Sequence, residues 1–443
     1  MSDLAASHAL PRADDEQRLD KYPALGVNLM AQITSRSRLN AAWKRVRANK
    51  GAGGVDGVTI DTFIEWFKPR AQAVQEQLTN GTYQPLPVER VTIPKPEGGE
   101  RHLGIPTVLD RIIQQSIVMT LEPYIDPSFS DASYGFRPNR SAHDAIDKIR
   151  SGINAGRKVA VDVDLSKFFD RVNHDVLMHL LAKHIDDKAV LKLIGRYLRS
   201  GVNENGKIVA SRKGVPQGGP LSPLLSNIVL DVLDKELESR GHHFARYADD
   251  FMILVKSQRA GKRVLSSITR FLSERLKLNV NAEKSQVVNY HRSQFLGFTF
   301  RGKHLQIHPK SLQRFKQRVR KLTSRTWGVG MSTKIVKLSR YLRGWIQYYG
   351  IANSYQRCTD LDHWIRRRLR MCYWKQWRRV RTKVSKLLSL GVPTTLSVTT
   401  GSSRKGYWHS AKTPGINWGL SNEWLLKQGL VSLRSQWITL HYG

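Results

Sequence analysis

The sequence is poor in cysteine, in long apolar runs and in acidic residues. Cys358 and Cys372 are the only cysteines, too few for a disulfide framework or a four-cysteine zinc site, so we expect a reducing compartment. No apolar run approaches the roughly 18 residues needed to span a bilayer, which predicts that no helix crosses a membrane. Residues 1–20 contain several acids and no basic-then-apolar start, so they do not resemble a secretory signal.

The scarcity of acids leaves a large positive charge. Asp and Glu number 36 against 72 Lys and Arg in 443 residues, a formal net charge of +36. Such a surplus repels itself, and nucleic acid is the partner that best neutralises it. The length allows two or three domains with a sizeable core. We therefore expect a protein of several domains that binds nucleic acid.

Helical periodicity is clearest towards the two ends of the chain. Apolar residues recur at helical spacing over residues 28–49, which predicts one helix there. Residues 310–386 contain 22 Lys or Arg and only two acids, with aromatic residues at helical spacing. This pattern predicts helices over residues 311–325, 332–349 and 360–384, with most rings in the core and the cations facing an anionic partner.

Two adjacent carboxylates, Asp249 and Asp250, stand between two largely apolar runs. The pattern predicts a β-hairpin over residues 244–255 with the acids at its tip, because strand-forming residues flank a pair that favours a turn. Neighbouring carboxylates repel each other, and a divalent cation with oxygen ligands relieves that repulsion. Taken alone, an Asp pair is more often a solvated surface turn.

A second predicted strand, residues 159–165, also carries acids near its end. Period-two alternation puts its three valines on one face, with Asp162 and Asp164 on the other. If Asp164 lies beside the hairpin tip, the three carboxylates match a two-metal nucleotidyl-transfer site, in which two ions clamp the attacking and leaving oxygens. The adjacency of the two strands is itself a prediction.

Two other segments contain candidate substrate contacts. Residues 91–96 and 101–105 predict a second hairpin with Lys95 and Arg101 near its tip, where two cations bind a triphosphate; ordinary surface cations are the alternative. Residues 213–223 form a Gly-rich loop that lets backbone approach a ligand, or a tight loop without one. Ser222 is expected to cap a helix over residues 224–237.

Together these segments resemble the successive blocks of reverse transcriptases, and most of all the bacterial group II intron-encoded reverse transcriptase/maturases. The blocks are Ile93-Pro94-Lys95-Pro96, Ser133-Tyr134-Gly135-Phe136-Arg137-Pro138, Asp164-Leu165-Ser166-Lys167-Phe168-Phe169-Asp170, Pro216-Gln217-Gly218-Gly219, Tyr247-Ala248-Asp249-Asp250 and Phe295-Leu296-Gly297-Phe298. Residues 342–349 and 364–370 resemble the family's maturase, or X, domain. The similarity covers roughly residues 28–440 in the family's order.

The resemblance implies an α+β fold: a right-hand polymerase, with antiparallel sheet in its fingers and palm, followed by an α-helical thumb/maturase domain. The implied domains are a flexible N-terminal arm (1–27), an N-terminal helical extension (28–85), the fingers and palm (86–305), the thumb/maturase domain (306–390) and a basic DNA-binding-like C-terminal appendage (391–443). The paired cysteines and histidines of the family's C-terminal endonuclease are missing. The chain therefore resembles the endonuclease-lacking lineages, and we do not expect it to cleave target DNA.

The resemblance also implies RNA-templated DNA synthesis with two Mg²⁺ ions, or Mn²⁺ in their place. By motif position, Asp164 and Asp249 are the main metal ligands, Asp250 completes the acidic cluster and the main-chain carbonyl of Leu165 contributes. Four residues match the family's contacts to the incoming nucleotide: the cations Lys95 and Arg101 on the triphosphate, Phe169 against a ribose 2′-OH, and Gln217 along the nascent pair.

The expected partners are structured intron RNA, an RNA template with a DNA primer, dNTPs and target DNA, with no membrane. Arg366, Arg367 and Arg370 are the predicted RNA contacts, because cations on all faces of one helix require an anionic partner. The implied roles are splicing assistance and intron mobility in the bacterial cytoplasm, at the nucleoid when bound to DNA. A reverse transcriptase recruited to host defence or repair is one alternative. A pure RNA-binding splicing cofactor is another, and the intact acids argue against it.

Overall fold

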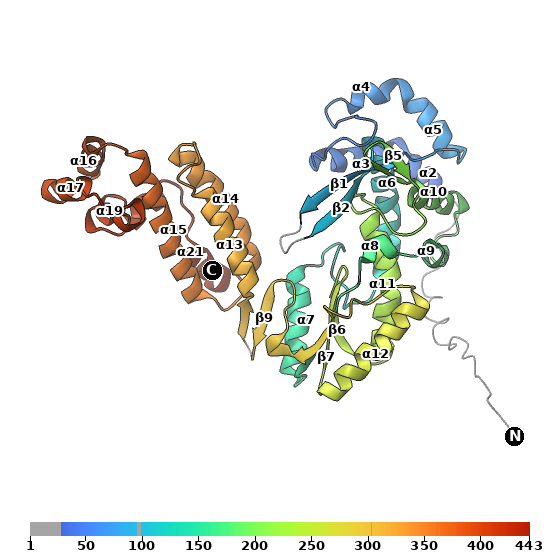
Figure 1. Cartoon of the computed structure of the whole chain (residues 1–443). Coiled ribbons are helices and arrows are strands. Elements are labelled where there is room, and N and C mark those ends of the chain that lie inside the picture. Colours follow the sequence, from blue (N-terminus) through green and yellow to red (C-terminus); the bar gives the residue numbers. More distant parts are fainter. Residues whose placement is uncertain (1–27, 95–98, 303) are drawn as a thin grey trace. The chain divides into compact units, whose positions relative to one another are not determined.

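The computed structural model describes residues 28–94, 99–302 and 304–443, which divide into two compact units, Met1–Asn289 (unit 1) and Tyr290–Gly443 (unit 2) (Figure 1). The predicted N-terminal arm lies outside the described residues. The finer division into five domains stays a prediction.

The central sheet of unit 1 has the strand order β6-β7-β3-β8, and every pairing in it is antiparallel. Its strands are β3 (Val159–Val163), β6 (His243–Tyr247), β7 (Asp250–Val255) and β8 (Gln286–Asn289). Val163 pairs with Phe251, and Tyr247 pairs with Asp250. The predicted hairpin and its adjacency to the acid-bearing strand are thus confirmed.

Helices cover both faces of this sheet. Gly261 of α12 (Gln258–Arg275) lies against Val159 and Val161. Gly152 of α7 (Ala142–Asn154) lies against Leu254, which points to the opposite face because it pairs with the residue between those two valines. Packing on both faces explains why β3 and β7 are apolar along most of their length.

A second sheet of unit 1 has the order β2-β1-β4-β5. Strands β1 (Val88–Pro94) and β2 (Glu100–Ile105) form the predicted hairpin, whose turn, with Lys95, lies outside the described residues. Strands β4 (Val202–Glu204) and β5 (Lys207–Val209) were not predicted, because three-residue strands show too little alternation. The pairing of β1 with β4 is parallel, so this sheet is mixed.

Helices account for most of the remaining residues of unit 1. They are α2 (Leu29–Thr34), α3 (Arg36–Ala48), α4 (Phe63–Phe67), α5 (Ala71–Thr79), α6 (Val108–Ile125), α8 (Phe168–Arg171), α9 (His174–Ala182), α10 (Lys188–Arg199) and α11 (Ser222–Ser239). The prediction of one helix over residues 28–49 was wrong. Ser35 separates α2 from α3 with an extended backbone (φ −60°, ψ 140°), and its side chain caps α3 by accepting from the Arg38 amide.

The expected cap of α11 was also wrong. Leu221 precedes the helix without a side-chain cap, and Ser222 is its first residue. The Ser222 hydroxyl donates instead to the main-chain oxygen of Pro216. This serine therefore fastens the Gly-rich loop to the helix that follows it.

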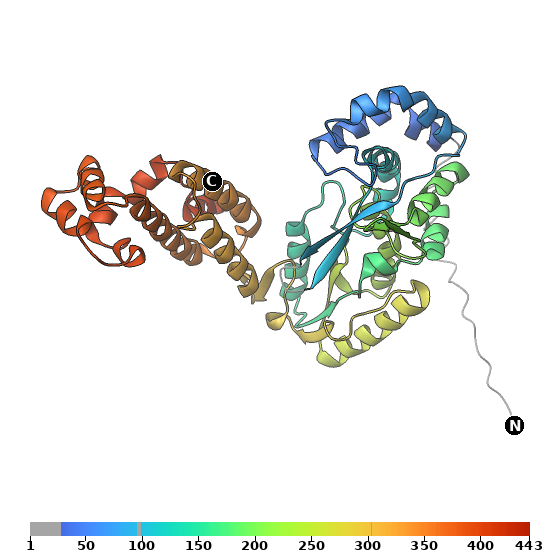
Figure 2. The same ribbon diagram turned by 45° about the horizontal axis from the view of Figure 1, so that its top comes forward.

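The described residues of unit 2 form helices and one β-hairpin, β9 (Phe298–Arg301) with β10 (His304–Ile307) (Figure 2). Its helices are α13 (Pro309–Leu322), α14 (Met331–Tyr349), α15 (Tyr355–Gln376), α16 (Val380–Ser389), α17 (Thr394–Gly401), α18 (Tyr407–Ser410), α19 (Pro414–Gly419), α20 (Asn422–Lys427) and α21 (Leu433–Tyr442). The single helix predicted over residues 360–384 breaks at Trp377 (ψ 61°) into α15 and α16. The α+β fold with a helical C-terminal region is confirmed. None of the described helices has the length and apolar character needed to cross a bilayer.

Candidate active site

Asp249 lies in the two-residue turn between β6 and β7, together with Ala248. Ala248 has a φ of +58°, in the left-handed region that disfavours residues with a side chain by roughly 1–2 kcal/mol. A two-residue hairpin turn requires such a φ so that its twist matches that of the strands. The tertiary structure must therefore hold this turn in place.

Arg246 is the residue that holds it. Its side chain is fully buried and forms an ion pair with the equally buried Asp234, with Nη2 and Oδ2 2.6 Å apart. Nη1 donates to the main-chain oxygen of Ala248 (3.0 Å) and to Asn227 Oδ1 (2.9 Å), and Nη2 also donates to Ser133 Oγ (2.6 Å). The guanidinium thus joins the turn to two other segments of unit 1.

Gly135 closes the other side of the turn. A Cβ atom on Gly135 would lie 2.2 Å from the Ala248 amide nitrogen and 2.9 Å from the Tyr247 carbonyl carbon. Asn227 Nδ2 donates to the Gly135 oxygen (2.9 Å), so one amide side chain contacts both supports of the turn. Sequence reasoning missed this network. A charged residue within an apolar strand, at position 246, was the available signal.

Asp164 directly follows β3 and is fixed through its backbone. The Asn281 amide donates to the Asp164 oxygen (2.8 Å), and the Ser166 amide donates to the Asn279 oxygen (2.9 Å). These bonds use the groups on either side of Leu165, whose own main-chain carbonyl therefore points away from this pairing. That orientation suits the contribution predicted for this carbonyl.

The acids at this end of the sheet influence one another electrostatically. Burial raises the pKa of Asp249, the charge of Asp164 adds to the rise, and Arg101 opposes it. Asp250 is an exposed residue, yet protein atoms crowd its carboxylate; this burial, with repulsion from Asp249 and Asp164, raises its pKa to about 6. Burial and the charge of Asp250 raise the pKa of Asp162 to about 7, against a hydrogen bond from Gln286.

The donor set fits a hard divalent cation whose coordination a substrate completes. Among the residues that the structure describes, no three or more His, Cys, Asp or Glu side chains gather closely enough to hold an ion alone. Mg²⁺ needs only one or two carboxylates when substrate phosphates supply further oxygens. Asp164 and Asp249 lie near enough that one raises the pKa of the other, as a shared cation would require.

Among the described cations, Arg101 has the largest electrostatic effect on the pKa values of Asp249 and Asp250. It lies on β2, exposed to solvent, and its charge lowers the pKa values of both Asp249 and Asp250. This placement suits a cation that meets a triphosphate beside metal-binding carboxylates. Its predicted partner Lys95 lies outside the described residues.

The Gly-rich loop bonds to the backbone of Phe169 and contains Gln217. The Val215 amide donates to the Phe169 oxygen (2.6 Å), and the Gly104 amide donates to the Gln217 oxygen (2.8 Å). Gly218 has a φ of +132°, and a Cβ atom there would lie 2.6 Å from the Gly104 oxygen. Protein backbone fills the space in which a Gly218 side chain would lie, so the close approach of β2 requires a glycine here. The approach of a ligand to the loop stays a prediction.

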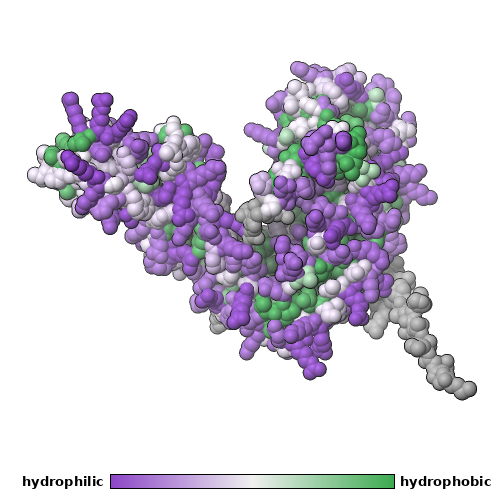
Figure 3. Space-filling view, viewed as in Figure 1, coloured by the Kyte–Doolittle hydropathy of each residue, from purple (hydrophilic) through white to green (hydrophobic). Residues whose placement is uncertain are grey.

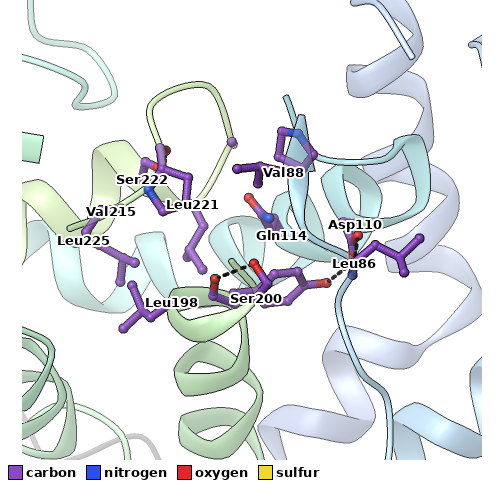
Figure 4. A pocket seen from close by; sticks show the side chains of 14 residues that line it. Leu86, Val88, Asp110, Gln114, Leu198, Ser200, Val215, Leu221, Ser222 and Leu225 are labelled. Carbon is purple, nitrogen blue, oxygen red and sulfur yellow. Dashed lines mark hydrogen bonds between the residues drawn. The ribbon is translucent and has the colours of Figure 1, made fainter. Parts of the chain in front are cut away.

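Behind this loop lies a cavity of about 20 Å³, room for about one water molecule (Figure 4). Asp110 at its edge accepts hydrogen bonds from the hydroxyls of Tyr83 (2.8 Å), Thr107 (2.8 Å) and Tyr197 (3.2 Å). Burial raises the pKa of Asp110, and these bonds oppose the rise. The cavity is too small for a nucleotide, so Asp110 is a structural anchor beneath the loop.

The three arginines predicted to contact RNA lie on α15 in unit 2 and differ in their surroundings. Arg370 is buried and donates to the Leu420 oxygen (2.8 Å) and to Asn422 (3.0 Å). Arg367 lies 3.9 Å above the Trp408 ring and donates to the Trp408 oxygen. Both therefore have structural contacts that the sequence did not indicate. Arg366 forms no hydrogen bond, ion pair or ring contact with the described residues, although it is half-buried near Asp362. Hydrophilic residues cover most of the face of unit 2 visible in Figure 3.

Comparisons with known proteins agree with this geometry. Residues 93–300 match the family model "Reverse transcriptase (RNA-dependent DNA polymerase)", so the chain contains a reverse transcriptase domain, most of which lies in unit 1. Residues 312–388 match "Group II intron, maturase-specific domain". The chain belongs to the group II intron-encoded reverse transcriptase/maturase family, which confirms the resemblance. Its enzyme class is RNA-directed DNA polymerase, combined with a maturase role, and enzymes of this class use divalent metal ions.

Two curated relatives show how much of the chain is shared. Protein YkfC of Escherichia coli K12 is 34% identical over 325 residues, which cover 64% of this chain and 84% of that protein. Group II intron-encoded protein LtrA of Lactococcus lactis is 34% identical over 248 residues, 56% of this chain but only 40% of LtrA. A chain of the structure "Partial Cas6-RT-Cas1--Cas2 complex" has a TM-score of 0.36 at 26% identity, and the match covers 56% of this chain and 42% of that one.

Proposed function

We propose that unit 1 copies RNA into DNA at the β6–β7 turn, with two Mg²⁺ ions held by Asp164 and Asp249. Asp250 and the main-chain carbonyl of Leu165 complete the ligands. Bound there, the ions would stabilise the charge that develops on the attacking and leaving oxygens. The observation that carries this proposal is the pairing of β3 with the hairpin, which gathers three mutually repelling carboxylates at one sheet end.

The remaining residues bind and select the nucleotide. Arg101, with Lys95 from the same hairpin, holds the triphosphate and neutralises part of the acids' repulsion. Phe169 lies five residues after Asp164 and excludes a ribose 2′-OH. Gln217, tied to β2 through Gly104, lies along the nascent pair. The hydrogen bonds of the Gly-rich loop support this assignment by joining the loop to α8 and to β2.

Unit 2 binds structured group II intron RNA, assists its splicing and takes part in intron mobility at target DNA. Residues 290–443 contain 30 Lys or Arg and three acids, a formal net charge of +27. A charge of this size exceeds what a short primer–template duplex needs, and phosphate groups are its natural counter-ions. The maturase-specific match over residues 312–388 supports the same partner.

The decisive experiment is primer extension on an RNA template by Asp249→Asn, an isosteric change that removes the charge. We expect the rate to fall more than about 100-fold, the several kcal/mol expected of a metal ligand. RNA binding should persist. Asp61→Asn, an exposed acid of the same unit, is the matched control. Extension above about a hundredth of the wild-type rate would refute the assignment.

A further inference from the structure

A polar cavity in unit 2 is lined by none of the residues assigned to the polymerase site. It measures about 540 Å³, within the range of about 300–1,000 Å³ typical of small-molecule sites. Its wall includes His363, Arg366 and Arg370 from α15, together with Asn417, Asn422 and Glu423 from the segment that follows α18. We call it the α15 pocket. Its charges and hydrogen-bonding groups distinguish it from an apolar packing defect.

Arg366 is the group in the pocket that most needs a partner. It is half-buried, and among the described residues we find no hydrogen bond or ion pair of its guanidinium. Asp362 is near enough to influence its pKa, but the Asp362 oxygens already accept from Ser432 Oγ (2.6 Å) and the Leu433 amide (2.9 Å). Arg370 adds a second, like charge. The arrangement therefore favours an anion from outside the unit.

Glu423 gives the pocket a second kind of binding group. It lies in the first turn of α20 and, among the described residues, forms no ion pair with Arg366 or Arg370, although all three line the pocket. A free phosphate would meet only repulsion from this carboxylate. A ligand with an anionic group at one end and N–H donors at the other satisfies both charges. A nucleotide has this combination, in its phosphate and in the amino group of its base.

We propose that the α15 pocket takes one unpaired nucleotide of the RNA that unit 2 binds, with the phosphate on Arg366 and a base amino group on Glu423. Proteins that read RNA sequence do so mostly at unpaired positions, where a base can leave the stack. The α15 side of the pocket falls within the maturase-specific match, residues 312–388. The inference rests on the proposed RNA partner and adds a site that selects a single unpaired position.

The test compares the full chain's affinity for two RNA duplexes, identical except that one has a single bulged cytosine. The expected wild-type preference for the bulge is about tenfold, the effect of one charge-assisted contact. Arg366→Ala should abolish this preference. Arg357→Ala removes an equal charge from an exposed position on the same helix and should preserve it. Thermal melting checks that both variants fold.

Base selection provides a second readout. The wild type should prefer bulged cytosine to bulged uracil, because uracil lacks the amino group that would donate to Glu423. Glu423→Gln should keep the preference for a bulge but bind the two bases equally, because an amide can accept from cytosine and donate to uracil. Two outcomes would each refute the proposed site: no bulge preference in the wild type, or equal preferences in Arg366→Ala and Arg357→Ala. Failure to bind either RNA would instead overturn the proposed RNA partner.

Discussion

The guanidinium of Arg246 donates a hydrogen bond to the carbonyl of Ala248, 3.0 Å away, and so fixes the residue that precedes Asp249. The same guanidinium is paired with Asp234 in the core. Turn geometry and core packing are therefore joined through one side chain. A substitution at either end of this link should therefore displace the carboxylates of the turn.

Arg246→Lys keeps a charge opposite Asp234 but loses the planar fork that reaches Ala248, Asn227 and Ser133. We expect a loss of roughly 2–3 kcal/mol in the free energy of unfolding, measured in urea, and at least a tenfold slower primer extension. Leu193→Ala, which destabilises a buried position of α10 by a similar amount, is the control. If both variants extend primers equally well under folding conditions, Arg246 does not position the turn.

Gly135→Ala should displace the turn directly, because the added Cβ would lie 2.2 Å from the Ala248 nitrogen. We expect primer extension to fall at least tenfold while RNA affinity stays within about twofold, since unit 2 is untouched. Gly328→Ala is the matched change, because a Cβ there meets nothing within 4 Å. Normal extension by Gly135→Ala would show that the turn tolerates movement.

Asp162 should make the metal-free protein less stable as pH rises. Its pKa is raised from 3.8 to about 7, so the native state binds this proton more tightly than the unfolded state does. Stability is therefore lost progressively between about pH 4 and 7. Asp162→Asn should raise the melting temperature at pH 8 by roughly 2–4 °C, since solvent screens this half-buried carboxylate, and should give a much smaller gain at pH 4.5. An equal gain at both pH values would contradict the shift.

Phe169→Ala should let the polymerase accept ribonucleotides. The ring is half-buried and packs edge-on against Phe168, with centroids 5.1 Å apart, which fixes its position. Removing it opens the space assigned to the 2′-OH, so we expect discrimination against ribonucleotides to fall at least tenfold. The ratio of kcat/KM for a dNTP and its ribonucleotide measures this, with dNTP extension as the check on folding. An unchanged ratio would show that a residue other than Phe169 excludes the ribose 2′-OH.

Local patterns predicted the central parts of the site. The alternation in residues 159–165 predicted one strand, and the apolar residues around Asp249 and Asp250 predicted a hairpin. Both predictions held because the observed register pairs that strand with the hairpin. The break at Ser35 was missed, since apolar spacing continues across it and only the serine's capping bond reveals it.

Contacts between distant segments were beyond such patterns. The partners of Arg246 come from positions 133, 227 and 234, and no period in the sequence links these positions. The roles of Arg367 and Arg370 were hidden for the same reason, because their acceptors, Trp408 and Leu420, follow about 40 to 50 residues later. Their charge alone predicted that all three α15 arginines contact RNA. In the structure, Arg367 and Arg370 bond to main-chain oxygens of unit 2, and Arg366 does not.

The formal net charge of +27 on residues 290–443 has a consequence for the lifetime of the protein. Self-repulsion lowers the stability of this unit, and a polyanion that binds only its folded form restores it by mass action. The structured RNA proposed as the partner of unit 2 would then also stabilise the folded unit. If unit 2 binds RNA as proposed, protein made without that RNA would unfold more often and be degraded sooner, so the abundance of the enzyme would follow the supply of the RNA.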